Sequence, residues 1–167
     1  MNGTNVAIHK YRFNKRQTMH TENDPIYSIG TAARMTGVSV HTLRLYEREG
    51  LVRPVKSSGN QRLYSDSDIE RIQCIRDAIN GEKISIAGIR HIHGMIPCWK
   101  IKNCPDEQRI VCKAFTGNGN GGCWTYEHEG NVCSTSECRE CPVYRFSSNC
   151  KSVKMLVRGN YTELQNI

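Results

Sequence analysis

Aromatic side chains and long apolar runs are scarce in this chain of 167 residues. Aromatic residues make up 7% of the sequence and hydrophobic residues 38%, so one large hydrophobic core is not expected. No apolar run approaches the ~18 residues that a membrane-spanning helix needs, and no signal-peptide segment of 7–15 apolar residues occurs near the start. We therefore expect a cytoplasmic protein without a membrane partner.

Basic residues exceed acidic ones. The chain has 23 Lys and Arg against 16 Asp and Glu, which gives a formal net charge of +7. Such an excess favours acidic partners, nucleic acid first. The excess is spread almost evenly along the chain, so the positions of basic side chains on helices must locate any binding surface.

Composition divides the chain into four segments. Residues 1–25 are polar and aperiodic, which predicts a disordered basic arm; Met19 is an alternative start, because clear structural patterns begin only after it. Residues 26–97 have helical periodicity, residues 98–150 are rich in Cys, Gly, Pro and Asn, and residues 151–167 can form a short amphipathic helix or tail.

Two short helices are predicted early in the second segment. Residues 31–36 are compatible with a helix that Gly37 ends, and Ser39 is a good N-cap for a second helix over residues 40–49. Two helices joined by such a turn form a helix-turn-helix. The second helix carries donors suited to phosphates and base edges, although a plain helical hairpin with a solvated basic face is the alternative.

A wing and two further helices are predicted next. Residues 51–55 and 61–64 are extended segments on either side of turn-forming residues, which is typical of a wing with a basic tip. Ser65 and Asp68 then form a capping-box pattern. This pattern opens a third helix with isoleucines along one stripe, and a fourth helix follows that ends at Pro97.

These residues resemble the DNA-binding domain of MerR-type transcription regulators. The resemblance covers about 70 residues and rests on several motifs in register: Tyr27–Gly30, Gly37–Arg44, Tyr46–Leu51, Gly59–Ser65 and Asp68–Ile72. It implies a mainly α fold, a winged helix-turn-helix followed here by a small, loop-rich cysteine module. It also implies a homodimer on double-stranded operator DNA, deformation of that DNA, and an indirect effect on RNA polymerase.

The resemblance also implies which side chains contact DNA. Carried over position by position, the recognition helix places five residues against the duplex: Ser39, His41, Thr42, Arg44 and Tyr46. The wing holds phosphate through Arg62, with Lys56 and Tyr64 near it. Many members have a tyrosine where Leu45 stands here, so one phosphate contact is missing. The long dimerisation helix of the family is missing too, because the helical pattern ends at Pro97. Two-fold contacts must then come from the cysteine-rich segment or the last 17 residues; the alternatives are binding as a monomer and dimerisation only on DNA.

Eight of the nine cysteines are gathered in the third segment: Cys98, Cys104, Cys112, Cys123, Cys133, Cys138, Cys141 and Cys150. Cys74 stands apart on the third helix and is predicted to be a buried, inert thiol. A cysteine cluster in a reducing compartment indicates metal or redox chemistry. The pairs Cys98-Trp99 and Cys123-Trp124 resemble paired Cys-Trp modules found beside bacterial regulatory domains.

Three chemistries remain open for the cysteines. Long, irregular spacings favour an iron–sulfur cluster over structural zinc, and thiol–disulfide chemistry without metal is the third possibility. The sequence thus predicts a non-enzymatic, DNA-binding transcription regulator that is switched by the metal or redox state of this module. The alternatives are a constitutive repressor with structural zinc, and a thiol–disulfide redox protein built on Cys138 and Cys141 with a DNA-binding tether. The last lacks the βαβ pattern that such a motif requires.

Overall fold

The computed structural model describes residues 20–117, 120–148 and 150–159. Most of the predicted basic arm, together with Met19, lies outside the described residues. The first part of the described chain contains β1 (Tyr27–Ser28), α1 (Ile29–Thr36), α2 (Val40–Arg48), β2 (Val55–Lys56), β3 (Arg62–Tyr64), α3 (Asp66–Asn80) and α4 (Ile86–Gly94).

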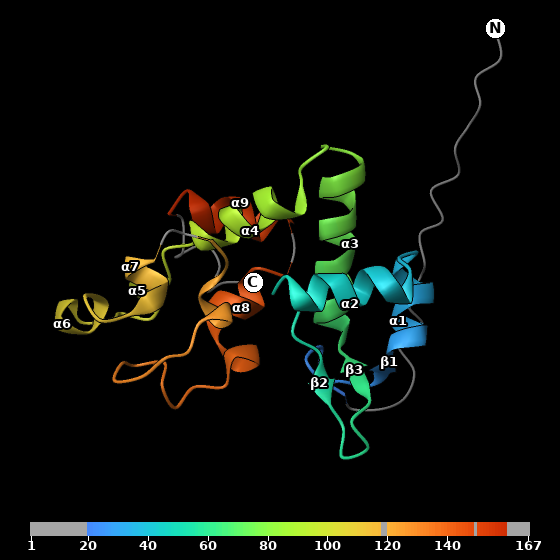
Figure 1. The fold of residues 1–167 in the computed structure, drawn as a ribbon, viewed down its shortest axis with the longest axis horizontal. Coiled ribbons are helices and arrows are strands. Elements are labelled where there is room, and N and C mark those ends of the chain that lie inside the picture. The colour runs from blue at the N-terminus through green and yellow to red at the C-terminus, as the bar shows by residue number, and fades with distance from the viewer. Residues whose placement is uncertain (1–19, 118–119, 149, 160–167) are drawn as a thin grey trace, which may run out of the picture.

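Short elements make up the second part of the chain (Figure 1). They are α5 (Cys98–Ile101), α6 (Asp106–Arg109), α7 (Lys113–Thr116), η1 (Cys123–Thr125), η2 (Cys138–Glu140), α8 (Pro142–Phe146) and α9 (Cys150–Val157). The predicted mainly α fold with a winged helix-turn-helix and a loop-rich module is confirmed. The C-terminal helix α9, of eight residues, is the longest element of the module.

Local signals set the boundaries of the first helices, as predicted. Gly37 ends α1 in the left-handed conformation, with φ of 66°, where a Cβ atom would be strained. The Ser39 side chain caps α2 by accepting a hydrogen bond from the Thr42 backbone N–H. These caps satisfy backbone groups that the helix ends leave free.

The start of α3 is a complete capping box. The Ser65 hydroxyl accepts from the Asp68 N–H, and the Asp68 carboxylate accepts from the Ser65 N–H at 2.9 Å. The fourth helix also begins as predicted, after its N-cap Ser85. It ends at Gly94, three residues before the Pro97 that was expected to end it.

The wing belongs to a three-stranded antiparallel sheet of order β1-β3-β2. Tyr27 lies opposite Tyr64, and Val55 lies opposite Leu63. The predicted hairpin is therefore confirmed, with strands shorter than expected. Because β1 pairs with β3, the entry to α1 is fixed to the base of the wing.

Two hydrophobic clusters replace a single large core, as the low aromatic content indicates. The first joins the helix-turn-helix, the wing and α3 around Leu43, Tyr64 and Ile72, each 0% exposed. The second lies in the cysteine module and includes Trp124 and Leu156. Ile96, expected on the fourth helix, belongs to this second cluster.

The cysteine module packs against the winged helix-turn-helix. Figure 1 shows α8 and α9 close to the helices of the first part, with the wing pointing away from α9. Residue pairs in contact join α9 both to α3 and to α8. Within the described residues, no helix has the length and apolarity needed to cross a membrane.

Candidate functional site

The start of α2 presents polar side chains to solvent. Ser39, His41 and Arg44 are exposed, and Thr42 is half-buried. The hydroxyl groups of Ser39 and Thr42 lie 2.9 Å apart, so the cap also orders the Thr42 side chain. The structure thus places four of the predicted DNA-contacting residues on the accessible part of one helix.

The two tyrosines among the predicted DNA contacts are buried in this structure. Tyr46 is 3% exposed and Tyr64 is 0% exposed, and both belong to the first hydrophobic cluster. Tyr46 lies three positions after the buried Leu43, which places it on the same inward face of α2. Burial raises the pKa of Tyr64 to about 12. These rings support the recognition helix and the wing from inside.

The two basic side chains of the wing, Lys56 and Arg62, differ in exposure and in ion pairing. Lys56 is exposed on β2, where it is available to a phosphate. Arg62 is half-buried, and its Nε lies 2.5 Å from Oε2 of Glu47 on α2. This ion pair ties the wing to the recognition helix, so a phosphate contact by Arg62 competes with Glu47.

The free thiols of the module line two small neighbouring hollows. The first, of about 10 Å³, is lined by Cys123, Cys133, Cys138 and Cys141. The second, of about 20 Å³, is lined by Cys98, Cys104, Cys112 and Cys133. His128 lines both hollows, and its Nε2 lies 2.9 Å from the Cys123 carbonyl oxygen. Seven of the eight predicted ligands are therefore neighbours.

These thiols affect one another's ionisation. A hydrogen bond between Cys98 and Cys123 lowers the pKa of Cys98 and raises that of Cys123 well above its ordinary value. Burial, followed by the charge of Cys141, raises the pKa of Cys133 to about 11. Mutual repulsion of thiolates is what a bound cation relieves.

The thiols do not form a coordination sphere as they stand. In the part of the chain that the structure describes, no three His, Cys, Asp or Glu side chains are arranged to hold a metal ion. The donors are soft and numerous enough for zinc or an iron–sulfur cluster, but side chains must converge to bind either. The metal site therefore stays a prediction.

Cys74 and Cys150 form a disulfide, which corrects two expectations. Cys74 is on α3 and Cys150 begins α9; their Cα atoms are 5.6 Å apart and their sequence separation is 76. Cys74 is thus not an inert thiol, and the sulfur of Cys150 is not a thiolate ligand in this state. The bond joins the winged helix-turn-helix covalently to the last described helix.

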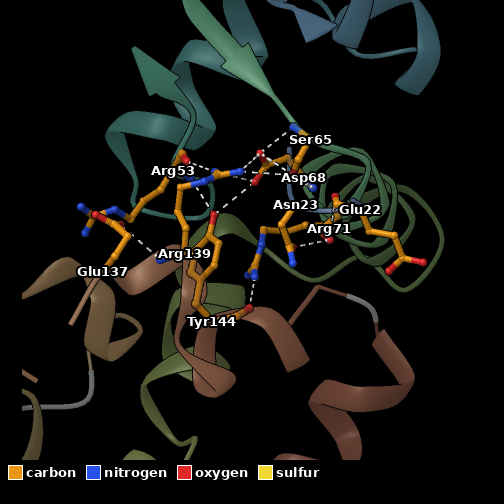
Figure 2. A network of polar contacts seen from close by, with 10 residues as sticks. Glu22, Asn23, Arg53, Ser65, Asp68, Arg71, Glu137, Arg139 and Tyr144 are labelled. Carbon is orange, nitrogen blue, oxygen red and sulfur yellow. Dashed lines mark hydrogen bonds and ion pairs between the residues drawn. The ribbon is translucent and has the colours of Figure 1, made fainter. Parts of the chain in front are cut away.

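A polar network joins the module to the first turn of α3 (Figure 2). Arg139, located between Cys138 and Cys141, donates from Nη2 to Oδ2 of Asp68 at 2.8 Å. The same guanidinium donates to the backbone carbonyl of Arg53, at the base of the wing. Asp68 is 1% exposed, so this is a buried ion pair that connects the Cys-x-x-Cys segment to α3.

A second arginine crosses the boundary in the opposite direction. Arg71 of α3 is 1% exposed and donates to the Tyr144 carbonyl and to the Ser147 hydroxyl, the latter at 3.1 Å. Its guanidinium lies 4.0 Å from the Tyr144 ring centroid, which adds a cation–π contact. Trp124 Nε1 also donates to the Gly50 carbonyl at 2.8 Å. Backbone and side chains of both parts are therefore interlocked.

The sequence does not predict the contacts between the cysteine module and α3. Arg139 and Arg71 lie 71 and 73 residues from their partners Asp68 and Tyr144, and no periodicity links positions so distant. The capping box identified Asp68 as a cap, but a second role for its carboxylate leaves no local pattern. An arginine inside a Cys-x-x-Cys segment was the available signal.

Comparison with known proteins supports the helix-turn-helix assignment. Residues 27–94 match the family described as MerR HTH family regulatory protein. The chain is 42% identical over 72 residues to heat shock protein HspR of Streptomyces coelicolor, which covers 43% of this chain and 48% of that protein. It is 32% identical over 68 residues to the HTH-type transcriptional regulator GlnR of Bacillus anthracis, and these residues are 41% of this chain and 52% of that protein.

A third relative is the mercuric resistance operon regulatory protein of Shigella flexneri. It is 40% identical over 52 residues, which are 30% of this chain and 36% of that protein. The chain thus spans about half the length, or less, of these relatives, and no solved structure matches it. The matched sequence, the helix caps and the wing thus make residues 27–94 similar to the helix-turn-helix domain of MerR family regulatory proteins.

Proposed function

We propose that this chain is a non-enzymatic transcription regulator that binds double-stranded operator DNA through α2 and the wing. The observation that carries the proposal is the exposed start of α2, where Arg44, His41 and Ser39 are accessible. The opposite face of α2 packs into the first hydrophobic cluster, which also contains Tyr64 of the wing. An accessible helix of this kind suits the major groove, whose base edges arginine reads well.

The cysteine module is the proposed switch. Arg139 lies within the Cys138–Cys141 segment and holds both Asp68 of α3 and the Arg53 carbonyl at the wing. A change in metal or oxidation state at these cysteines moves the segment, and the buried ion pair transmits the movement to α3.

Thiol–disulfide chemistry gains support from the Cys74–Cys150 bond. This bond connects α3 to the module without metal, so an oxidative switch and a metal switch act through the same boundary. Metal, acid-labile sulfide and free-thiol content of protein purified without oxygen distinguish them. Iron with sulfide supports the cluster, zinc alone makes the module structural, and absence of metal leaves the disulfide as the switch.

A homodimer is part of the proposal. The tip formed by α6 and α7 exposes Ile110, Val111 and Phe115 at 71%, 63% and 40%. Such exposed apolar side chains favour association with a second copy, which replaces the dimerisation helix that this sequence lacks. Sedimentation with and without DNA tests this, and a monomer on a palindromic duplex contradicts it.

The replacement Arg44→Ala is expected to weaken specific DNA binding by about 5- to 150-fold, because one bidentate base contact contributes ~1–3 kcal/mol of discrimination. The duplex is first selected from a random-sequence pool with the wild-type protein. Fluorescence anisotropy then compares the selected and a scrambled duplex at several salt concentrations, since phosphate contacts set the salt dependence.

The control for this prediction is Arg158→Ala. Arg158 is exposed at the end of the module, and its replacement removes the same charge from a place outside the proposed interface. It should leave the preference for the selected duplex unchanged. Equal losses in the two variants would show a general charge effect, and an unaltered preference in Arg44→Ala would remove α2 from the interface.

A further inference from the structure

A cavity of about 90 Å³ lies where α3 and α4 of the DNA-binding domain meet α9. Its walls are largely apolar and include Ile75, Ala78, Ile84, Ile89, Ile92 and Val153. The Cys74–Cys150 disulfide forms part of the lining. The cavity is separate from the DNA-facing side of α2 and from the two hollows of the free thiols.

Two buried polar side chains also line this cavity. Arg71 is 1% exposed and His93 is 5% exposed. Within the described residues, Arg71 Nε and His93 Nδ1 have no hydrogen-bond partner. A buried nitrogen without a partner destabilises the protein, and more so when the group is charged. An otherwise apolar cavity therefore contains two nitrogens in need of a partner.

Arg71 also lacks a carboxylate of its own. None of the ion pairs found in the described ranges includes it, and the nearby Asp68 is paired with Arg139. Burial lowers the pKa of Arg71, and burial together with Arg71 lowers that of His93 to about 3. The positive charge of Arg71 in the cavity wall is thus incompletely neutralised. The two other charged residues of the lining, Glu82 and Lys154, are exposed and have opposite charges that cancel.

We propose that this cavity binds a small organic monocarboxylate, with its hydrocarbon tail among the isoleucines and its carboxylate at Arg71 and His93. Apolar cavities of ~150 Å³ accept benzene, so about 90 Å³ suits a tail of roughly four carbons. The carboxylate supplies the acceptor that Arg71 Nε lacks and a counter-charge for its guanidinium.

Such a ligand bridges the two parts of the protein. Its tail contacts α3 and α4 and its other side contacts α9, next to the disulfide. Binding therefore stabilises the docked module without touching DNA. Carboxylate binding is measured on the protein without DNA, so it does not depend on the proposed regulatory function.

The test uses the full-length oxidised protein with 3-methylbutanoate and its neutral analogue 3-methylbutanamide. The acid should bind about tenfold tighter (~1.4 kcal/mol), because a hydrogen bond between charged groups is stronger than one to a neutral group. Calorimetry and thermal unfolding measure binding. Tryptophan fluorescence provides a local signal, because the Trp124 ring centroid lies 5.4 Å from the Arg71 guanidinium carbon.

The variant Ala78→Leu fills the cavity with a larger side chain, and Ala87→Leu on the exposed face of α4 is its control. Binding should be lost in the first and kept in the second. Equal binding of acid and amide, or binding that survives Ala78→Leu, overturns the proposal. Should Ala78→Leu fail to fold, the acid–amide comparison in the wild type still decides, and no binding of either compound shows that the cavity holds only water.

Discussion

Replacing Arg139 with alanine is expected to lower the free energy of unfolding by about 3–5 kcal/mol, since removing one partner of a buried ion pair leaves the other uncompensated. Asp68 is 1% exposed, and its carboxylate accepts from Arg139 as well as from its own capping box. The Arg53 carbonyl loses its donor in the same variant. Urea unfolding followed by circular dichroism measures the loss.

Two further variants define the origin of this effect. Arg139→Lys keeps the charge but not the planar fork, so it should recover part of the stability. Arg48→Ala, at an exposed position on α2, removes an equal charge and should change stability by less than ~0.5 kcal/mol. A loss below ~1 kcal/mol in Arg139→Ala would mean that the pair behaves as a surface salt bridge, and the proposed route from the cysteines to α3 would lose its basis.

Removal of the disulfide by Cys150→Ser is expected to lower the free energy of unfolding by about 4 kcal/mol under oxidising conditions. The bond closes a loop with a sequence separation of 76, and a cross-link of that span mainly restricts the unfolded chain. Cys74→Ser should have the same effect. Addition of a dithiol reductant should bring the wild type to the stability of both variants.

The control for the disulfide is Cys112→Ser in metal-free protein, which replaces a half-buried free thiol of the module. Its stability should remain close to that of the wild type, and reduction of the Cys74–Cys150 bond should lower it by the same amount as in the wild type. Thiol titration gives a second readout: of nine cysteines, the two in the disulfide should be unreactive in denatured, unreduced protein. Nine reactive thiols would show that the bond does not form.

Local chemistry was predictable from sequence because it acts over a few residues. The Gly37 C-cap and the Ser65–Asp68 capping box each involve neighbours in the chain. The exposed positions of Arg44 and His41 follow from helical periodicity alone. Most of residues 27–94 and the accessible part of the recognition helix could therefore be derived before any coordinates.

Long-range relations were not predictable in the same way. The pairing of Cys74 with Cys150, and of Asp68 with Arg139, depends on how two parts of the chain dock. The burial of Tyr46 shows the limit of carrying contacts over from a resemblance. A tyrosine can match a motif and still face the core, because only three-dimensional packing decides which side of a helix is covered.

The shared carboxylate of Asp68 has a consequence for protein synthesis. Arg139 follows Asp68 by 71 residues, so at ~5–20 residues per second the ribosome adds it roughly 4–14 s later. The capping box is complete before then, because Ser65 and Asp68 leave the ribosome together. The nascent DNA-binding domain can thus begin α3 on its own, and the counter-ion reaches the waiting carboxylate only after most of the cysteine module has been made.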